Sequence, residues 1–504
     1  MGFEAEAFTE GFPSLIEDSS GSRWTPLFRK SCEFDSRIFL DVMMNFIRNP
    51  NINSNWLFRA DILVEQNPDQ LTSTDPLVTR PTILHFQHMH LDKILVRKLI
   101  PRNTLRDQPL DQTCLIYHGT EPGNIERSMV VYKPHISSPA DIPYYHPKIQ
   151  GLAFLHEWNA ENNEGTISIH YHFFDNNGNE SEDDSPKLVR TGLNLLGMLH
   201  KHGEGTKAGY VKRVHHDTIV PQIPIQNTYA RLKETYARQL IETWAEVTDP
   251  SKHVFEDLGI AAFLIELWAR MYQDSPFPGF VDIGCGNGLL VHILHEEGYP
   301  GWGFDARKRK SWENYSRKMS EGPESKETLR QHVLLPSVIS HHPNLGIADG
   351  GDSESVTGVD SSNIIHDGVF PEGTFIISNH ADELTPWTPI LATLSNCPFI
   401  MIPCCSHNLT GARFRAPAPK AKNKSSSAYS SLVEWVTKIA TDCGWELETE
   451  MLRIPSTRNT GLLGRKRSRP TSSVDIEEII GKYGGTEGYT DNVMKLVHKS
   501  ERGH

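Results

Sequence analysis

The stretch FVDIGCGNGLLVHIL, residues 280–294, decides how the second half of the chain folds. A short apolar run leads into a turn that holds three glycines, and a second apolar run follows at helical spacing. Glycines at such a turn let the backbone bend sharply, and they let a ligand approach without a Cβ in its way. The pattern therefore predicts a strand, a ligand-binding turn and a helix whose first N–H groups have no partner within the helix.

Three kinds of ligand compete for this turn. A P-loop needs a Lys and a Ser or Thr after its last glycine, but Gly288 is followed by Leu289 and Leu290. A dinucleotide fingerprint reads Gly-x-Gly-x-x-Gly, and the spacing here is one residue short. Asp282 suits an ammonium group, and Asp305 after the next predicted strand suits two ribose hydroxyls. These carboxylates favour S-adenosylmethionine, with the following candidate contacts: Asp282, Gly284, Cys285, Gly286, Asn287, Gly288, Asp305 and Ala306.

Beyond the turn, predicted strands alternate with helices, which indicates α/β structure with a mostly parallel sheet and helices on both faces. We expect this domain to span residues 276–470, with a C-terminal tail at 471–504. Its strands are predicted at 280–283, 302–304, 333–335, 374–378, 399–402, 446–454 and 460–465, and a helix at 429–443. Two flexible surface insertions are expected, an acidic one near 344–370 and a Pro-, Lys- and Ser-rich one near 416–431.

The first half of the chain carries no catalytic signature. Residues 1–205 are expected to form an α+β region, because short apolar runs bounded by Gly, Pro and charged residues are typical of strands. A helical lead-in should follow at 206–275. Apolar residues recur there at i, i+3 and i+4 from Tyr229 to Trp244 and from Val254 to Tyr272, which predicts two long helices.

The bulk composition excludes several classes of protein. The net charge of −13 argues against a general nucleic-acid binder, although short basic clusters occur. No window approaches eighteen uninterrupted apolar residues, and the N-terminus has no secretory pattern, so we expect no membrane span. Seven cysteines without a disulfide-like rhythm suit a reducing compartment, so we expect a cytoplasmic protein.

Several blocks of the chain resemble a known family. The turn continues into Asp-Ala-Arg-x-Arg-x-Ser-Trp at residues 305–312, and the other matching blocks are RVHHDTIVP, DPSKHVFEDLGIAAFLIELW, SNHADELTPW, IPCCSHNLTGARF and RIPSTRNTG. Together they resemble the eukaryotic tRNA (uracil-2′-O)-methyltransferases that act on uridine 44 of serine tRNA. The resemblance covers roughly residues 205–465 and is loose in the N-terminal half.

The resemblance implies a class I (Rossmann-like) methyltransferase fold, S-adenosylmethionine as the methyl donor and serine tRNA as the acceptor. The N-terminal region would then bind tRNA or act as a scaffold, and the sequence identifies no protein partner. Two alternatives stay open, a methyltransferase of RNA bases or proteins on the same fold, and a non-catalytic RNA-binding scaffold. The intact acidic residues and glycines of the turn argue against the scaffold.

Polar residues after two later strands are the candidates for chemistry, because ligands bind at the carboxyl ends of strands in doubly wound sheets. Methylation of a ribose hydroxyl requires a base and stabilisation of a developing alkoxide. The candidate catalytic residues are His380, Asp382, Glu383, His407 and Arg458, and Asn379 is a further candidate cofactor contact. The Cys-Cys-x-His run at 404–407 lacks the fourth ligand of a structural zinc site, so we expect no metal.

Basic residues and one tryptophan are the candidates for RNA contact. Arginine and lysine neutralise phosphates, and an exposed indole stacks on a base. The candidates are Lys212, Arg213, Arg307, Arg309, Trp387, Arg413 and Arg453.

Overall fold

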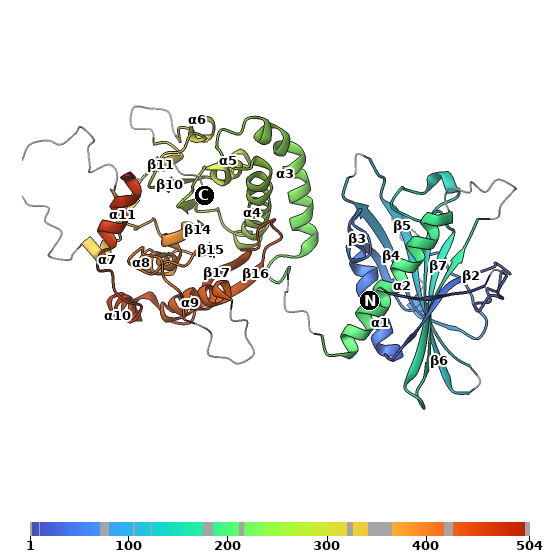
Figure 1. Ribbon diagram of the computed structural model, residues 1–504. Coiled ribbons are helices and arrows are strands. Elements are labelled where there is room, and N and C mark those ends of the chain that lie inside the picture. The colour runs from blue at the N-terminus through green and yellow to red at the C-terminus, as the bar shows by residue number, and fades with distance from the viewer. Residues whose placement is uncertain are drawn as a thin grey trace, which may run out of the picture. The chain divides into compact units, whose positions relative to one another are not determined.

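The computed structural model describes residues 3–9, 11–70, 80–103, 106–121, 123–174, 185–210, 216–319, 326–340, 365–417 and 427–498. It divides into two compact units, Met1–Lys212 and Arg213–His504 (Figure 1). Most of the predicted insertion at 344–370, and the middle of the one at 416–431, lie outside the described residues. Lys212 and Arg213 also lie outside them.

The N-terminal unit is an antiparallel sheet of eight strands with helices against one face (Figure 1). The strand order is β1-β2-β8-β7-β6-β5-β4-β3. The strands are β1 (Glu6–Ala7), β2 (Thr25–Cys32), β3 (Leu57–Gln66), β4 (His90–Pro101), β5 (Leu110–Glu121), β6 (Ile125–Pro134), β7 (Gly151–Asn159) and β8 (Glu164–His172). Ile167, Ile169 and Tyr171 alternate along β8 and pack with α1 (Ser36–Arg48) and α2 (Ser185–Lys207).

The C-terminal unit contains a seven-stranded sheet in the order β11-β10-β9-β14-β15-β17-β16. The strands are β9 (Phe280–Ile283), β10 (Gly301–Asp305), β11 (Leu329–Gln331), β14 (Phe375–Asn379), β15 (Phe399–Ile402), β16 (Trp445–Met451) and β17 (Thr460–Arg467). The first five strands of the order pair in parallel, and β17 is antiparallel to both of its neighbours. The predicted mostly parallel sheet is confirmed. The order reverses between β9 and β14, where doubly wound sheets bind their ligands.

Helices cover both faces of this sheet, because successive side chains of each buried strand point to opposite sides. Phe280 of β9 packs with α3 (Gln222–Glu242), α4 (Pro250–Met271) and α5 (Leu289–Glu296). Val281, its neighbour, packs in a second core with α8 (Thr388–Leu394) and α9 (Ala428–Asp442). The two long predicted helices therefore belong to the same compact unit as the sheet.

Two segments differ from their sequence-based expectations. The strand predicted at 333–335 is β12 (Val333–Leu334), which pairs only with β13 (Ile365–His366), whereas the edge of the large sheet is β11. The segment predicted as a C-terminal tail contains α10 (Ile476–Lys482) and α11 (Tyr489–His498). The Tyr489 ring is buried, and its hydroxyl donates to the carbonyl of Leu334 at 2.9 Å, so this segment is part of the second core.

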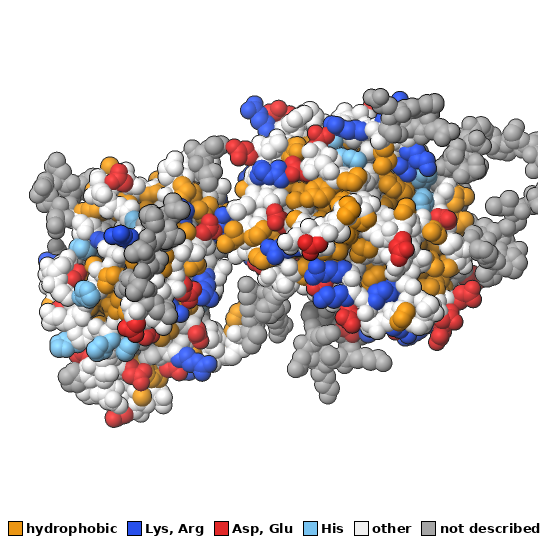
Figure 2. All heavy atoms as spheres, turned by 180° about the vertical axis from the view of Figure 1, so that it is seen from behind, with side chains coloured by type: hydrophobic (Ala, Val, Ile, Leu, Met, Phe, Trp, Pro, Cys, Tyr) orange, Lys and Arg blue, Asp and Glu red, His pale blue; other side chains and the backbone are white. Residues whose placement is uncertain are grey.

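The remaining short elements complete the C-terminal unit: α6 (Trp312–Tyr315), α7 (Ser337–Ser340) and a 3₁₀ turn at Asp382–Trp387. On the face seen in Figure 2, acidic and basic side chains are interspersed over both units. None of the helices in the described ranges is long and apolar enough to cross a membrane.

Candidate active site

The glycine turn between β9 and α5 has a backbone conformation that residues other than glycine rarely adopt. Gly284, Gly286 and Gly288 have φ values of 70°, 52° and 75°. A Cβ on Gly288 would lie 2.4 Å from Cδ1 of Leu329, whereas a Cβ on Gly286 would meet nothing within 4 Å. Gly288 is therefore required by packing, and Gly286 leaves open space beside the backbone.

Asp305 at the end of β10 fixes the turn. Its Oδ2 accepts the backbone N–H of Gly286 at 3.1 Å, and its Oδ1 accepts that of Arg307 at 3.0 Å. A carboxylate oxygen can accept more than one hydrogen bond, so Asp305 keeps acceptor capacity for a ligand's hydroxyls. A second side chain stabilises the turn, since the indole N–H of Trp312 donates to the Gly286 carbonyl at 2.9 Å.

A cavity of about 440 Å³ opens at the carboxyl ends of the central strands. It is lined by residues of the glycine turn, of α4 with the loop before it, and of the loops after β14 and β15. The predicted site residues among them are Asp282, Gly284, Cys285, Gly286, Asn287, Arg309, Asn379, His380, Asp382 and Arg458.

Two buried carboxylates line this cavity, and neither makes an ion pair with a described residue. Asp282 is 1% exposed, and its Oδ1 has no hydrogen-bond partner among the described residues. Asp257 of α4 is 8% exposed, and its Oδ1 receives only a long hydrogen bond of 3.4 Å from the Asn379 amide. Burial and the charge of Glu256 raise the pKa of Asp257 to about 8. Burial, and then Asp257 and Asp305, raise the pKa of Asp282 well above its ordinary value.

A second, smaller cavity of about 180 Å³ adjoins the first, with which it shares Gly284, Gly286, Arg309, His380 and Asp382. It adds four more predicted residues, Asp305, Ala306, Arg307 and Glu383, and the apolar side chains Phe304, Leu334, Leu384 and Val493. Burial, together with the charges of Asp382 and Asp305, raises the pKa of Glu383 to about 7.

The loop after β14 carries two residues in the left-handed region, His380 at φ 52° and Asp382 at φ 42°. Such backbone persists only where the surroundings hold it, and it is concentrated at functional sites. His380 Nε2 lies 2.9 Å from Glu256 Oε1. Because a carboxylate only accepts, a neutral His380 ring carries its proton on Nε2 and keeps a lone pair on Nδ1. Burial raises the pKa of Glu256, but the His380 bond and nearby cations outweigh it, so the pKa is lowered and Glu256 is ionised.

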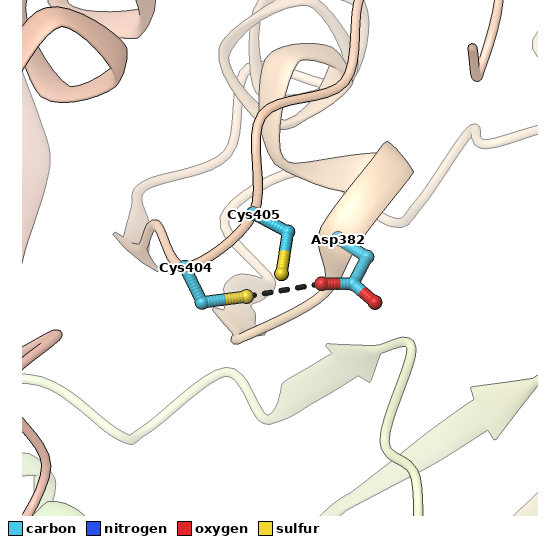
Figure 3. Close-up of side chains that lie close together, drawn as sticks. All are labelled: Asp382, Cys404 and Cys405. Carbon is cyan, nitrogen blue, oxygen red and sulfur yellow. Dashed lines mark hydrogen bonds between the residues drawn. The ribbon is translucent and has the colours of Figure 1, made fainter. Parts of the chain in front are cut away.

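Asp382 is contacted by two thiols from the loop after β15 (Figure 3). The Cys404 thiol donates to Asp382 Oδ1 at 3.0 Å, and the Cys405 thiol also turns toward that carboxylate. Burial and the Asp382 charge raise the pKa of both thiols, so they stay protonated and act as donors. Asp382, Cys404 and Cys405 are the one group of three His, Cys, Asp or Glu side chains in the described ranges whose ligand atoms lie close enough to share a metal ion. A closed zinc site needs a fourth ligand.

Arg458 is the cation that the loop after β16 brings to the larger cavity. Its guanidinium carbon lies 4.7 Å from the ring centroid of Tyr429, and the Tyr429 hydroxyl accepts the backbone N–H of Thr460 at 3.0 Å. The ring therefore supports a positive charge at the cavity wall.

Two predicted roles are wrong. Trp387 is 0% exposed, and its indole N–H donates to the Leu409 carbonyl at 3.1 Å, so it is a core residue that cannot stack on RNA. His407 is buried and lines neither cavity, and its backbone pairs with that of Arg413. His407 is therefore not placed for catalysis.

The other predicted RNA contacts are placed differently from one another. Arg413 is exposed. Arg453 makes a bidentate ion pair with Asp217, at 2.9 and 2.5 Å, which ties the loop after β16 to the segment before α3. Arg307 and Arg309 line the cavities themselves.

The sequence interpretation missed the contribution of α4. Lys252, His253, Glu256 and Asp257 line the larger cavity, together with Glu246 and Thr248 from the preceding loop. The sequence contained one indication of this contribution, the spacing of the polar residues. Lys252 and Glu256 form one i,i+4 pair and His253 and Asp257 form another, on a helix that is otherwise apolar. Lys252 also brings a lysine to the cavity, whereas the segments that follow β14 and β15, residues 379–387 and 403–414, contain none.

Comparison with known proteins decides the family. A model described as "TRM44-like, N-terminal bet v1-like domain" matches residues 6–213, and one described as "Predicted AdoMet-dependent methyltransferase" matches residues 219–326. A protein of Neurospora crassa named tRNA (uracil-O(2)-)-methyltransferase is 54% identical over 98% of this chain and 97% of its own length. The chain belongs to the tRNA (uracil-O(2)-)-methyltransferase family.

Further members of this family match along their whole length. The proteins of the same name from Schizosaccharomyces pombe and Saccharomyces cerevisiae are 38% and 36% identical, each over 98% of this chain and 96% of its own length. The resemblance drawn from the sequence blocks is thereby confirmed. The chain has an N-terminal bet v1-like domain and an AdoMet-dependent methyltransferase domain.

S-adenosylmethionine, the cofactor of such a domain, fits the residues that line the two cavities. The unpartnered Asp282 and the Asp257 carboxylate suit its ammonium group. Asp305 has acceptor capacity for ribose hydroxyls, and Gly286 leaves room for close approach. The apolar side chains of the smaller cavity offer surface to an adenine ring.

Proposed function

We propose that this chain transfers the methyl group of S-adenosylmethionine to the ribose 2′-oxygen of a uridine in tRNA. Its full-length kinship with proteins named for that reaction supports the proposal. The observation that carries it is the buried, unpartnered Asp282 carboxylate beside the glycine turn. An ionised carboxylate there is costly without a cation, so the site is built to receive one.

We infer a class I, Rossmann-like fold for the catalytic domain. The sheet reverses its strand order between β9 and β14, and the glycine turn follows β9, the first strand of the domain. This is where a doubly wound sheet binds a nucleotide-like ligand. The antiparallel pair β16 and β17 extends the sheet beyond β15.

Within this proposal, the residues of the two cavities have separate roles toward the donor. Asp282 and Asp257 hold the ammonium group, Asp305 accepts from the ribose, and the backbone of Gly284 and Gly286 lies against the bound molecule. Bound S-adenosylmethionine supplies an electrophilic methyl group on a sulfonium centre.

The acceptor hydroxyl needs a base, and His380 is our candidate, with an Nδ1 that is buried and has no hydrogen-bond partner among the described residues. Glu256 fixes the tautomer and stabilises the imidazolium that forms when Nδ1 takes the proton, as a carboxylate does for a catalytic histidine in other enzymes. Lys252 and Arg458 line the same cavity and offer positive charge to the developing alkoxide. Asp382 is the alternative base, although one of its oxygens already accepts from Cys404.

Uridine 44 of serine tRNA is the proposed acceptor, on the strength of the resemblance in the sequence blocks. A cytoplasmic location is also proposed, and it is supported by seven free cysteines, which suit a reducing compartment.

Two measurements on the purified chain test the donor and the class of acceptor. Calorimetry should show binding of S-adenosylhomocysteine, the product of the donor. Tritiated S-adenosylmethionine should label the RNA of a modification-deficient extract and leave its proteins unlabelled. Label in protein alone would overturn the proposal.

A further inference from the structure

The N-terminal unit has an exposed aromatic and cationic cluster that belongs to neither of the two cavities described above. Trp56 is 46% exposed and Tyr144 is 55% exposed, and their rings meet edge to face with centroids 5.3 Å apart. Large exposed aromatic rings are uncommon on a soluble protein, and adjacent ones mark a binding surface.

Two basic side chains complete this cluster. The guanidinium carbon of Arg106 lies 5.6 Å from the Trp56 ring centroid and 5.7 Å from that of Tyr144. The Lys187 ammonium lies 4.1 Å from the Tyr144 centroid and donates to the Tyr144 carbonyl at 3.4 Å. Both basic residues are exposed. We call Trp56, Arg106, Tyr144 and Lys187 the aromatic platform.

The platform is assembled from four segments that are distant in the sequence. Trp56 immediately precedes β3, Arg106 lies between β4 and β5, Tyr144 lies between β6 and β7, and Lys187 is in the first turn of α2. The convergence of these segments on one spot is a property of the fold, so the platform is not a local accident of a single loop.

Buried neighbours hold the two rings in place. Leu57, next to Trp56, is buried in a small core with Leu99 and Leu110, and Tyr145, next to Tyr144, packs against that core. The Tyr145 hydroxyl donates to the Gln108 carbonyl at 2.9 Å. A surface that is ordered before binding loses little side-chain entropy when a partner arrives.

We propose that the aromatic platform binds an unpaired base of the RNA substrate, with Trp56 or Tyr144 stacking on the base and Arg106 and Lys187 contacting the flanking phosphates. This inference rests on the proposed tRNA substrate. Sequence-independent binding of unpaired nucleotides combines aromatic stacking with basic side chains, and the platform offers both on a chain whose net charge is −13. Each stack contributes through the face of a base, so it requires no particular sequence.

The test uses the full-length chain and an unmodified serine tRNA transcript. Of Trp56→Ala and Tyr144→Ala, the variant that removes the stacked ring should raise the Kd for this tRNA about 10-fold, the loss expected for one base stack. KM for tRNA should rise in parallel, while kcat and the Kd for S-adenosylhomocysteine stay unchanged. Trp56→Phe, which keeps an aromatic face, should recover most of the affinity. Arg106→Gln should lower the slope of log Kd against log salt by about one phosphate contact.

Tyr210→Ala is the matched control, because Tyr210 belongs to the same unit and is 72% exposed but is not in the platform. It should leave the tRNA affinity unchanged. If the platform variants bind tRNA within twofold of the wild type, the inference is overturned. Clusters of aromatic residues and arginine also bind proteins. Platform variants that bind tRNA normally but associate less tightly with a protein partner would therefore overturn the inference as well.

Failure of the proposed function would look different. A wild-type chain that neither binds nor methylates tRNA would overturn the proposed substrate and the platform together. A wild type that methylates tRNA, with platform variants that bind it normally, would overturn the platform alone.

Discussion

His380 Nε2 lies 2.9 Å from Glu256 Oε1, joining the loop after β14 to the interior of α4 across 124 residues of sequence. The pair combines a strained backbone at His380 with a carboxylate that stays ionised although it is largely buried. A histidine held in this way has a defined tautomer, with the proton on Nε2 and a lone pair on Nδ1.

The first prediction concerns this pair. His380→Asn should lower kcat by about 10²–10³, the usual contribution of a positioned base, and leave the Kd for S-adenosylhomocysteine within twofold. Glu256→Gln should lower kcat less, because the ring remains but its tautomer is no longer fixed. Asp382→Asn is the control: if it lowers kcat this far and His380→Asn does not, Asp382 is the base.

The second prediction concerns the two carboxylates that face the larger cavity. Asp282→Asn should weaken binding of S-adenosylhomocysteine by at least about 10-fold, since a charge-assisted hydrogen bond to its ammonium is lost. Binding of 5′-methylthioadenosine, which lacks the amino-acid part, should change little. Calorimetry with both ligands checks this. Equal losses for the two would show that Asp282 acts through the shape of the turn.

The third prediction follows from the raised pKa of Asp257, about 8 against an ordinary 3.8. Between these values the unfolded chain releases a proton that the folded chain retains, so the Asp257 contribution to folding stability falls as pH rises. Asp257→Asn keeps a neutral group at every pH. The variant should therefore equal the wild type near pH 4 and exceed it by roughly 2–4 kcal/mol near pH 8 without ligand.

Denaturant unfolding at several pH values measures this difference. A variant that is less stable than the wild type at pH 8 would show that Asp257 is ionised and paired in the folded chain. Asp257→Asn should also bind S-adenosylhomocysteine less tightly, because the substitution removes the carboxylate that is proposed to hold the ligand's ammonium group.

The fourth prediction separates two glycines of the turn. Gly288→Ala should destabilise folding by roughly 2–4 kcal/mol, because a Cβ at positive φ would overlap Leu329. Gly286→Ala has open space, so it should cost only about 1 kcal/mol of backbone strain. Its added methyl group should instead weaken S-adenosylhomocysteine binding. Similar melting temperatures for the two variants would contradict this division of roles.

The sequence predicted best what depends on local pattern. The strands at 280–283 and 399–402 have the predicted bounds, because each is a short run that is buried on both faces and, apart from Asp282, is apolar. The glycine turn was visible for the same local reason. In contrast, β11 is the short sequence Leu-Arg-Gln, which is a strand only because Leu329–Gln331 pairs with β10. No periodicity marks such a segment.

The errors at single residues have tertiary causes. Trp387 follows a polar run and was expected at the surface, but α11 covers it. The Tyr489 ring of α11 packs edge to face against the indole, with ring centroids 5.4 Å apart. The polar face of α4 contributes Glu256 and Asp257, and their partners His380 and Asn379 lie more than a hundred residues later in the chain. A single sequence shows the spacing of the polar residues on α4, but it does not show that they contact the end of β14.

The central claim is methyl transfer to one ribose, and mass spectrometry of nuclease-digested tRNA tests it most directly. Purified chain, S-adenosylmethionine and an unmodified serine tRNA transcript should yield one 2′-O-methyluridine per molecule, at position 44. A transcript with 2′-deoxyuridine at that position should remain unmethylated. A methyl group found on a base, or 2′-O-methyluridine that still forms when that hydroxyl is absent, would contradict the account.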